Sequence, residues 1–96
     1  MLTGKAIVME GRDNVATVVE PIDAPREIIV EAGSRKVVVH VTENIPIGHK
    51  FAIRDIPKGS DILKYGEPIG VARADIRAGQ HVHVHNLESK RGRGDQ

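Results

Sequence analysis

Residues 36–59, KVVVHVTENIPIGHKFAIRDIPKG, decide the fold class of this 96-residue chain. Valine occupies every second position at Val37, Val39 and Val41, which predicts a strand with one buried face, because alternate residues of a strand point to opposite faces. Two segments of turn-forming composition come after these valines, NIPIG at 44–48 and DIPKG at 55–59. An extended run interrupted by glycine turns is typical of a β domain built from short strands.

The composition of the whole chain supports this interpretation. Valine and isoleucine total 23 residues against three leucines, and β-branched side chains favour a pleated sheet over a helix. Ten glycines and five prolines divide the chain into short pieces, none of which has a sustained 3.6-residue apolar repeat. We therefore expect one mostly-β domain with an aliphatic core, since Phe51 and Tyr65 are the only aromatic residues. So small a core favours assembly with a partner, and a homodimer of the isolated chain is one such assembly.

The strands outside this segment can be placed from the turn residues. Residues 5–10 and 14–20 are predicted to pair around the turn at 11–13, and residues 27–31 and 36–41 around the turn at 32–35. The proline-bounded segment 21–25 connects the two pairs.

A pattern of the form [DN]-I-x-x-G occurs three times, at 44–48, 55–59 and 75–79. We expect the Asp or Asn side chain to accept a hydrogen bond from the backbone two residues on, the isoleucine to be buried, and the glycine to take a left-handed conformation. Each copy precedes a predicted extended run, at 49–54, 61–63 and 81–85. Asp55 and Asp75 are thus expected to form turns rather than to catalyse.

Charge and composition exclude several classes of protein. The 14 Lys and Arg residues nearly balance the 13 Asp and Glu residues, which argues against a nucleic-acid-binding protein. There is no cysteine for a disulfide, a thiolate metal site or a nucleophile. No apolar run approaches the roughly 18 residues of a membrane span, and the N-terminal residues do not resemble a signal peptide, so a cytoplasmic location is expected.

The five histidines are the candidate functional residues, and three of them alternate in the segment HVHVH at 81–85, just before Asn86. In a strand, His81, His83 and His85 would form a row on one face, with the valines between them facing the core. Neutral imidazole binds Zn, Fe, Mn or Ni. Two such histidines can share an ion, whereas three in a straight strand span ~13 Å. The alternative is that these histidines only supply the polar face of a half-buried strand.

His49 and Lys50 form a second polar pair, directly after the glycine turn at 44–48. Lys50 can bind a carboxylate, or it can be an ordinary surface lysine, and His40 has the pattern of an ordinary strand residue. No phosphate loop, nucleophile elbow or HExxH motif is present. The residues alone describe a β module with a histidine-rich polar ridge rather than a self-sufficient enzyme.

Three segments together carry a resemblance to a known family: GHKFAIRDI at 48–56, KYGEPIG at 64–70 and GQHVHVHN at 79–86. They resemble the SAF domain of the altronate/galactarate dehydratase family, with Gln80 at a position where the family pattern has Glu. The resemblance covers residues 1–87 and implies a small single-domain β-clip (antifreeze-like) fold. Residues 88–96 are then expected to form a flexible polar tail.

The resemblance also implies a function. The chain looks like the small, non-autonomous subunit of a metal-dependent sugar-acid dehydratase, paired with a large catalytic subunit that holds most of the Fe²⁺ or Mn²⁺ site. His83, His85 and Asn86 are the expected catalytic residues, with His83 and His85 also as metal ligands. His49, Lys50 and His81 are the expected substrate-binding residues.

Three other functions stay open at this point. The family also includes the small subunit of (2R)-sulfolactate sulfo-lyase, which eliminates sulfite rather than water. A stand-alone module that binds a sugar acid or a metal is the second alternative. A structural assembly role, as in the pilus relatives of this fold, is the third, and the lack of a signal peptide counts against it.

Overall fold

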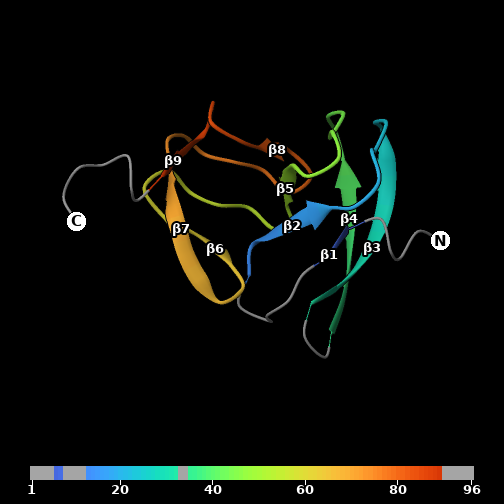
Figure 1. Cartoon of the computed structure of the whole chain (residues 1–96), viewed down its shortest axis with the longest axis horizontal. Coiled ribbons are helices and arrows are strands. Elements are labelled where there is room, and N and C mark those ends of the chain that lie inside the picture. Colours follow the sequence, from blue (N-terminus) through green and yellow to red (C-terminus); the bar gives the residue numbers. More distant parts are fainter. Residues whose placement is uncertain (1–5, 8–12, 33–34, 90–96) are drawn as a thin grey trace.

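The computed structural model describes residues 6–7, 13–32 and 35–89, and all of their regular structure is β-strand (Figure 1). A four-stranded sheet has the order β1 (Ala6–Ile7), β2 (Val15–Val18), β5 (Lys50–Ala52), β8 (His81–Val82). It lies between a hairpin of β3 (Arg26–Ala32) and β4 (Arg35–Val41) and a three-stranded sheet of β6 (Asp61–Lys64), β7 (Glu67–Ala72) and β9 (Leu87–Ser89). The mostly-β prediction is confirmed, and the described residues contain no helix able to span a membrane.

The predicted strands are found with shifted ends. The hairpin of β3 and β4 matches the prediction, with Arg26 opposite Val41 and Val30 opposite Val37. β1 and β2 pair antiparallel as expected, although residues 8–12 lie outside the described part of the chain. At the other end β9 pairs with β7 as far as Ser89, so the sheet continues past the domain boundary expected at residue 87. The rest of the predicted tail, residues 90–96, lies outside the described residues.

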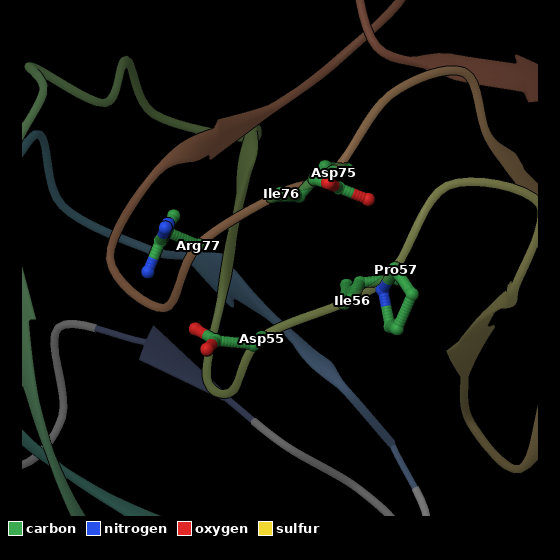
Figure 2. A pocket seen from close by; sticks show the side chains of 6 residues that line it. All are labelled: Asp55, Ile56, Pro57, Asp75, Ile76 and Arg77. Carbon is green, nitrogen blue, oxygen red and sulfur yellow. The ribbon is translucent and has the colours of Figure 1, made fainter.

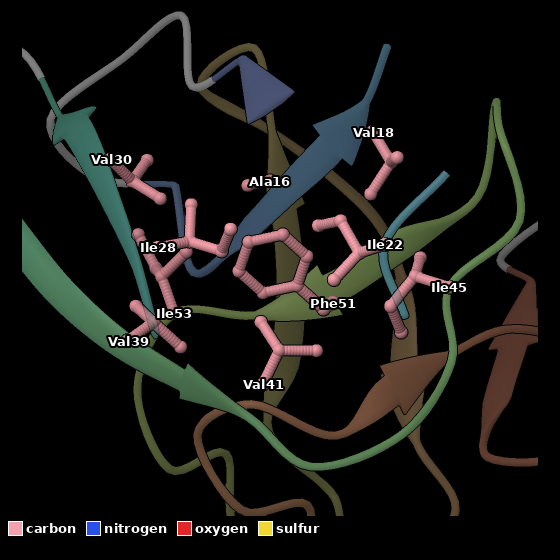
Figure 3. Close-up of a cluster of buried hydrophobic side chains, with 10 residues drawn as sticks. All are labelled: Ala16, Val18, Ile22, Ile28, Val30, Val39, Val41, Ile45, Phe51 and Ile53. Atoms are coloured by element: carbon pink, nitrogen blue, oxygen red, sulfur yellow. The ribbon is translucent and has the colours of Figure 1, made fainter. Parts of the chain in front are cut away.

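Two hydrophobic clusters cover opposite faces of the four-stranded sheet. In β5, Phe51 points into one cluster and Ala52 into the other, because successive residues of a strand face opposite ways. The first cluster lies against the β3–β4 hairpin around Phe51 and is otherwise aliphatic (Figure 3): Ala16, Val18, Ile22, Ile28, Val30, Val39, Val41, Ile45 and Ile53. The second lies against the β6–β7–β9 sheet: Val15, Ala52, Ile56, Ile62, Ala72, Ile76 and Val82.

The repeated motif forms pairs of segments joined by reciprocal backbone hydrogen bonds. Ile56 and Ile76 face each other, with N–H to C=O distances of 2.7 and 2.8 Å in the two directions. Ile45 of the first copy pairs in the same way with Ile22, at 2.9 and 3.0 Å. All four side chains are buried, as predicted for Ile45, Ile56 and Ile76.

The expected role of the Asp and Asn side chains in these motifs is wrong in one respect: each caps the segment opposite rather than its own turn. Asp55 Oδ1 accepts the Ala78 N–H at 2.9 Å, and Asp75 Oδ1 accepts the Lys58 N–H at 2.9 Å. The facing segments run antiparallel, so each carboxylate reaches the free N–H groups of its partner's turn. Figure 2 shows the two segments side by side around a cavity of about 280 Å³, lined by Asp55, Ile56, Pro57, Asp75, Ile76 and Arg77.

The glycines that end the three copies have positive φ, as predicted: +84° at Gly48, +86° at Gly59 and +92° at Gly79. A Cβ at Gly48 or Gly59 would meet open space. A Cβ at Gly79 would overlap the main-chain carbonyl oxygen of His40, so this turn can approach β4 only because it has no side chain.

We therefore predict different costs for alanine at Gly79 and at Gly48. Both substitutions place alanine in the left-handed region, which costs about 1–2 kcal/mol. Gly79→Ala adds overpacking against the backbone, worth about a further 1–3 kcal/mol, whereas Gly48→Ala does not. Urea unfolding of the two variants measures this difference. Equal losses in the free energy of unfolding would show that the contact with His40 does not constrain the fold.

Candidate functional site

Three imidazoles from two parts of the chain meet at one edge of the four-stranded sheet. His49 directly precedes β5 and His81 begins β8, and these strands pair with Phe51 opposite His81. This register places His49 Nδ1 2.9 Å from His81 Nε2. The ring of His83 stacks on that of His49 with a centroid distance of 4.0 Å and an interplanar angle of 15°. We call His49, His81 and His83 the histidine cluster.

The prediction of a strand over residues 81–85 is wrong, because β8 ends at Val82 and residues 83–86 form a turn. Val82 is buried as expected, but Val84 is 71% exposed instead of facing the core. The turn is closed by the N–H of Leu87, which donates to the His83 carbonyl at 2.8 Å. It folds His83 back over His49, so the imidazoles form a cluster rather than the predicted row.

Asn86 explains why the strand stops. Its Oδ1 accepts the His83 N–H at 2.9 Å, and its Nδ2 donates to the His81 carbonyl at 2.8 Å. A short amide side chain that binds nearby backbone in this way competes with a sheet ladder for the same groups. Asn86, expected at the active site, therefore has a visible role as the residue that fixes the turn carrying His83.

Within the part of the chain that the structure describes, two groups of side chains have ligand atoms close enough to share an ion. In the histidine cluster the three candidate nitrogens all lie within 4.8 Å of one another, and the same holds for the ligand atoms of Glu43, His81 and His85. His81 belongs to both groups. His83 and His85, predicted to share one ion, fall in different groups, and the rings of His81 and His85 are 5.3 Å apart and tilted by 41°.

Glu43 is a residue that the sequence reasoning missed. It lies just before the first copy of the motif, and its Oε1 accepts the backbone N–H of His81 at 3.1 Å. The two residues are 38 positions apart, and no sequence motif links them. The Thr42 N–H donates to the Gly79 carbonyl at 3.0 Å, and this backbone contact brings the two segments together.

The donor chemistry of the histidine cluster fits a divalent transition metal. Metal–imidazole bonds are about 2.1 Å long, so two such nitrogens at right angles around an ion lie about 3 Å apart. His49 and His81 already have this separation, which equally suits a hydrogen bond between two neutral rings. Burial and the neighbouring His49 lower the pKa of both His81 and His83. Both effects favour the neutral imidazole, which is the form that binds metals.

Lys50 lies beside the cluster and is partly buried on β5. Burial lowers its pKa, and repulsion by Lys64 lowers it further. The charge of Lys50 also contributes to the lowered pKa of His83. His40, by contrast, lies on β4 with its Nε2 3.3 Å from Glu27 Oε2, and it does not join the cluster.

Comparison with known proteins identifies the class of domain. The chain belongs to the altronate/galactarate dehydratase SAF domain family, whose model matches residues 4–90, and this confirms the resemblance found in the sequence.

Its relatives include sugar-acid dehydratases and a sulfo-lyase subunit. It is 40% identical over 90 residues to altronate dehydratase of Escherichia coli K12, a match that covers 94% of this chain and 17% of that protein. It is also 40% identical over 88 residues to (2R)-sulfolactate sulfo-lyase subunit alpha of Chromohalobacter salexigens, covering 88% of this chain and 94% of that subunit. The same subunit of Paracoccus pantotrophus is 46% identical over 48 residues, covering 50% of this chain and 72% of that subunit. This chain therefore spans about a sixth of the E. coli dehydratase but nearly all of the Chromohalobacter subunit.

The lowered pKa values predict that acid destabilises the protein through these histidines. The unfolded state takes up their protons first as the pH falls, so the stabilisation is complete above the ordinary histidine pKa of about 6.5 and is lost as the pH falls through the lowered values. Urea unfolding measures how much the free energy of unfolding falls between pH 7 and pH 5. This fall should be smaller for the His81→Gln/His83→Gln double variant than for the natural chain. An equal fall would contradict the lowered pKa values of His81 and His83, which NMR titration of the two rings checks directly.

Proposed function

We propose that this chain is the small, non-autonomous subunit of a metal-dependent lyase of the altronate dehydratase type, which eliminates water from a sugar acid. The observation that carries the proposal is the convergence of His49, His81 and His83 at one edge of the sheet, with Lys50 next to them. Polar groups with perturbed pKa values gathered in this way are typical of functional sites.

The proposal includes a large catalytic partner. The altronate dehydratase of E. coli is several times longer than the part that this chain matches. The name of the sulfo-lyase relative, subunit alpha, describes one chain of a multi-subunit enzyme. We infer that the edge carrying the histidine cluster faces the partner, so that the imidazoles complete an active site whose Fe²⁺ or Mn²⁺ is bound mainly by the large subunit.

The elimination requires three functions, which the side chains of this chain and of the large subunit can divide between them. The proton α to the carboxylate must be removed, the β-hydroxyl must leave with a proton, and the carboxylate must be held. A bound divalent ion supplies Lewis acidity, which stabilises negative charge on the carboxylate as the α-proton departs. Lys50 binds the carboxylate, His83 and His85 exchange protons with substrate, and Asn86 holds His83 in position. His49 and His81 orient the ring of His83 and are available as ligands.

The sulfo-lyase is a second candidate, supported by the match over 94% of the Chromohalobacter subunit. Loss of sulfite from a 2-hydroxy acid requires the same α-proton removal and the same hold on the carboxylate. The two candidates differ in the leaving group, whose pocket belongs to the partner. A stand-alone module that binds a sugar acid or a metal is the remaining candidate, and it requires no partner.

The test is to isolate the tagged chain with its bound large subunit from its own cells and to assay the complex anaerobically with Fe²⁺. We expect dehydration of altronate and no activity of the chain alone. Sulfite release from sulfolactate without altronate turnover would move the assignment to the sulfo-lyase. A chain that binds no partner and has neither activity would contradict both enzymes.

Variants of the same complex test the histidine cluster. His81→Gln should lower kcat/KM by about 10–100-fold, the usual cost of losing a group that ligates or orients a metal ligand. His40→Gln is the matched control, because His40 lies outside the cluster, and it should leave kcat/KM unchanged. Equal activities for the two variants would show that the cluster only fills a polar surface.

A further inference from the structure

We propose that the outer face of the β3–β4 hairpin is a docking surface for a second copy of this chain, which packs on it about a twofold axis parallel to the strands. The hairpin lies at one side of the molecule (Figure 1). Such a dimer goes beyond the proposed lyase and is independent of it, because the histidine cluster is carried by other elements, β5 and β8.

The two faces of this hairpin differ in burial, because successive residues of a strand point to opposite faces. On the inner face Ile28, Val30 and Val39 belong to the first hydrophobic cluster (Figure 3). On the outer face Ile29 lies opposite Val38, so the centre of this face is an apolar cross-strand pair. Ile29 is half-buried and Val38 is 55% exposed. Covering this pair with apolar side chains of another molecule would be favourable.

The charged side chains around this pair are sorted by strand. β3 contributes the acidic residues Glu27 and Glu31, and β4 contributes the basic residues Lys36 and His40. All four are exposed. The register places Glu31 opposite Lys36 at one end of the face. At the other end Glu27 lies opposite His40, with 3.3 Å between Glu27 Oε2 and His40 Nε2. An apolar centre with a polar rim is the usual anatomy of a protein interface.

The charges of this face match those of a second copy in one of the two possible face-to-face orientations. A twofold axis parallel to the strands places β3 of one chain over β4 of the other, at the same height along the hairpin. Ile29 then faces Val38 of the second copy. Likewise, Glu31 faces Lys36 of the second copy. A twofold axis across the strands would instead place β3 over β3, with Glu27 facing Glu31. Like charges suppress that orientation, so charge selects the first one.

This self-complementarity identifies the occupant as a second copy of the chain. A twofold dimer presents the same patch from both sides, so the patch has to be complementary to itself. The outer face meets this requirement in its apolar row and in both of its charged rows. Six side chains form a patch smaller than a stable interface needs. We therefore expect a weak dimer, with a Kd on the order of 100 µM.

Charge reversal tests the dimer in the full chain. Sedimentation equilibrium between about 20 µM and 1 mM should show a monomer–dimer equilibrium for the natural chain. Glu31→Lys and Lys36→Glu each place like charges face to face, and each should weaken the dimer at least fivefold. An equimolar mixture of the two variants should associate more tightly than either alone, because one chain then presents two lysines to two glutamates of the other. Lys58→Glu, which reverses an exposed lysine in a different turn, is the control and should dimerise as the natural chain does.

Three results would overturn the inference: a natural chain that stays monomeric at the highest concentration, a Glu31→Lys chain that dimerises as tightly as Lys58→Glu, or a mixture that associates no more tightly than its components. If the natural chain is monomeric and both reversals abolish binding of the large subunit, the face belongs to that subunit instead. None of these results touches the lyase assignment, which depends on the activity of the complex.

Discussion

The reciprocal pairing of the isoleucine-centred segments is the constraint on which the rest of this structure depends. Ile56 and Ile76 exchange backbone hydrogen bonds, and the carboxylates before them cap each other's turns. A chain of this size has little apolar surface to bury. Because the four segments centred on Ile22, Ile45, Ile56 and Ile76 are held by backbone hydrogen bonds, the hydrophobic core does not have to fix them alone. The turn at Gly79 continues the arrangement, since its N–H donates to Ala52 and its carbonyl accepts from Thr42.

The position of the histidines follows from these turns. His49 comes directly after the glycine of one copy and His81 two residues after the glycine of another, and the strands that follow pair with each other. A slip of one residue in this register would turn His81 to the opposite face of the sheet and break the cluster. The pairing of β5 with β8 therefore brings His49 and His81 together. Asn86 ends β8 after Val82, and the turn that follows adds His83 to the cluster.

Much of this arrangement can be predicted from the sequence. The valine alternation predicts the β3–β4 hairpin, and the three [DN]-I-x-x-G segments predict buried isoleucines and left-handed glycines. These features are local, because each depends on the conformation of a few neighbouring residues. The family could also be predicted, since three separate motifs carry it.

The remaining features depend on which segments face each other in space. The capping of opposite turns by Asp55 and Asp75 can be predicted only if their segments are known to pair. Glu43 reaches His81 only because the segments of Thr42 and Gly79 lie side by side. The prediction of a strand over 81–85 was wrong because it used only the alternation HVHVH, which is compatible with a strand. The side chain of Asn86 binds the His83 N–H and selects a turn instead. Tyr65 is a similar case, because its left-handed conformation depends on Asp13, 52 residues away.

The central claim is that His49, His81 and His83 form one functional cluster whose nitrogens can meet a divalent ion, and paramagnetic NMR of the chain titrated with Mn²⁺ tests it most directly. We predict that the ring signals of these three residues broaden first and together, while those of His40, whose side chain lies outside the cluster beside Glu27, persist. His81→Gln should abolish this selectivity. Broadening that begins at His40, or that affects all histidines equally, would contradict the account.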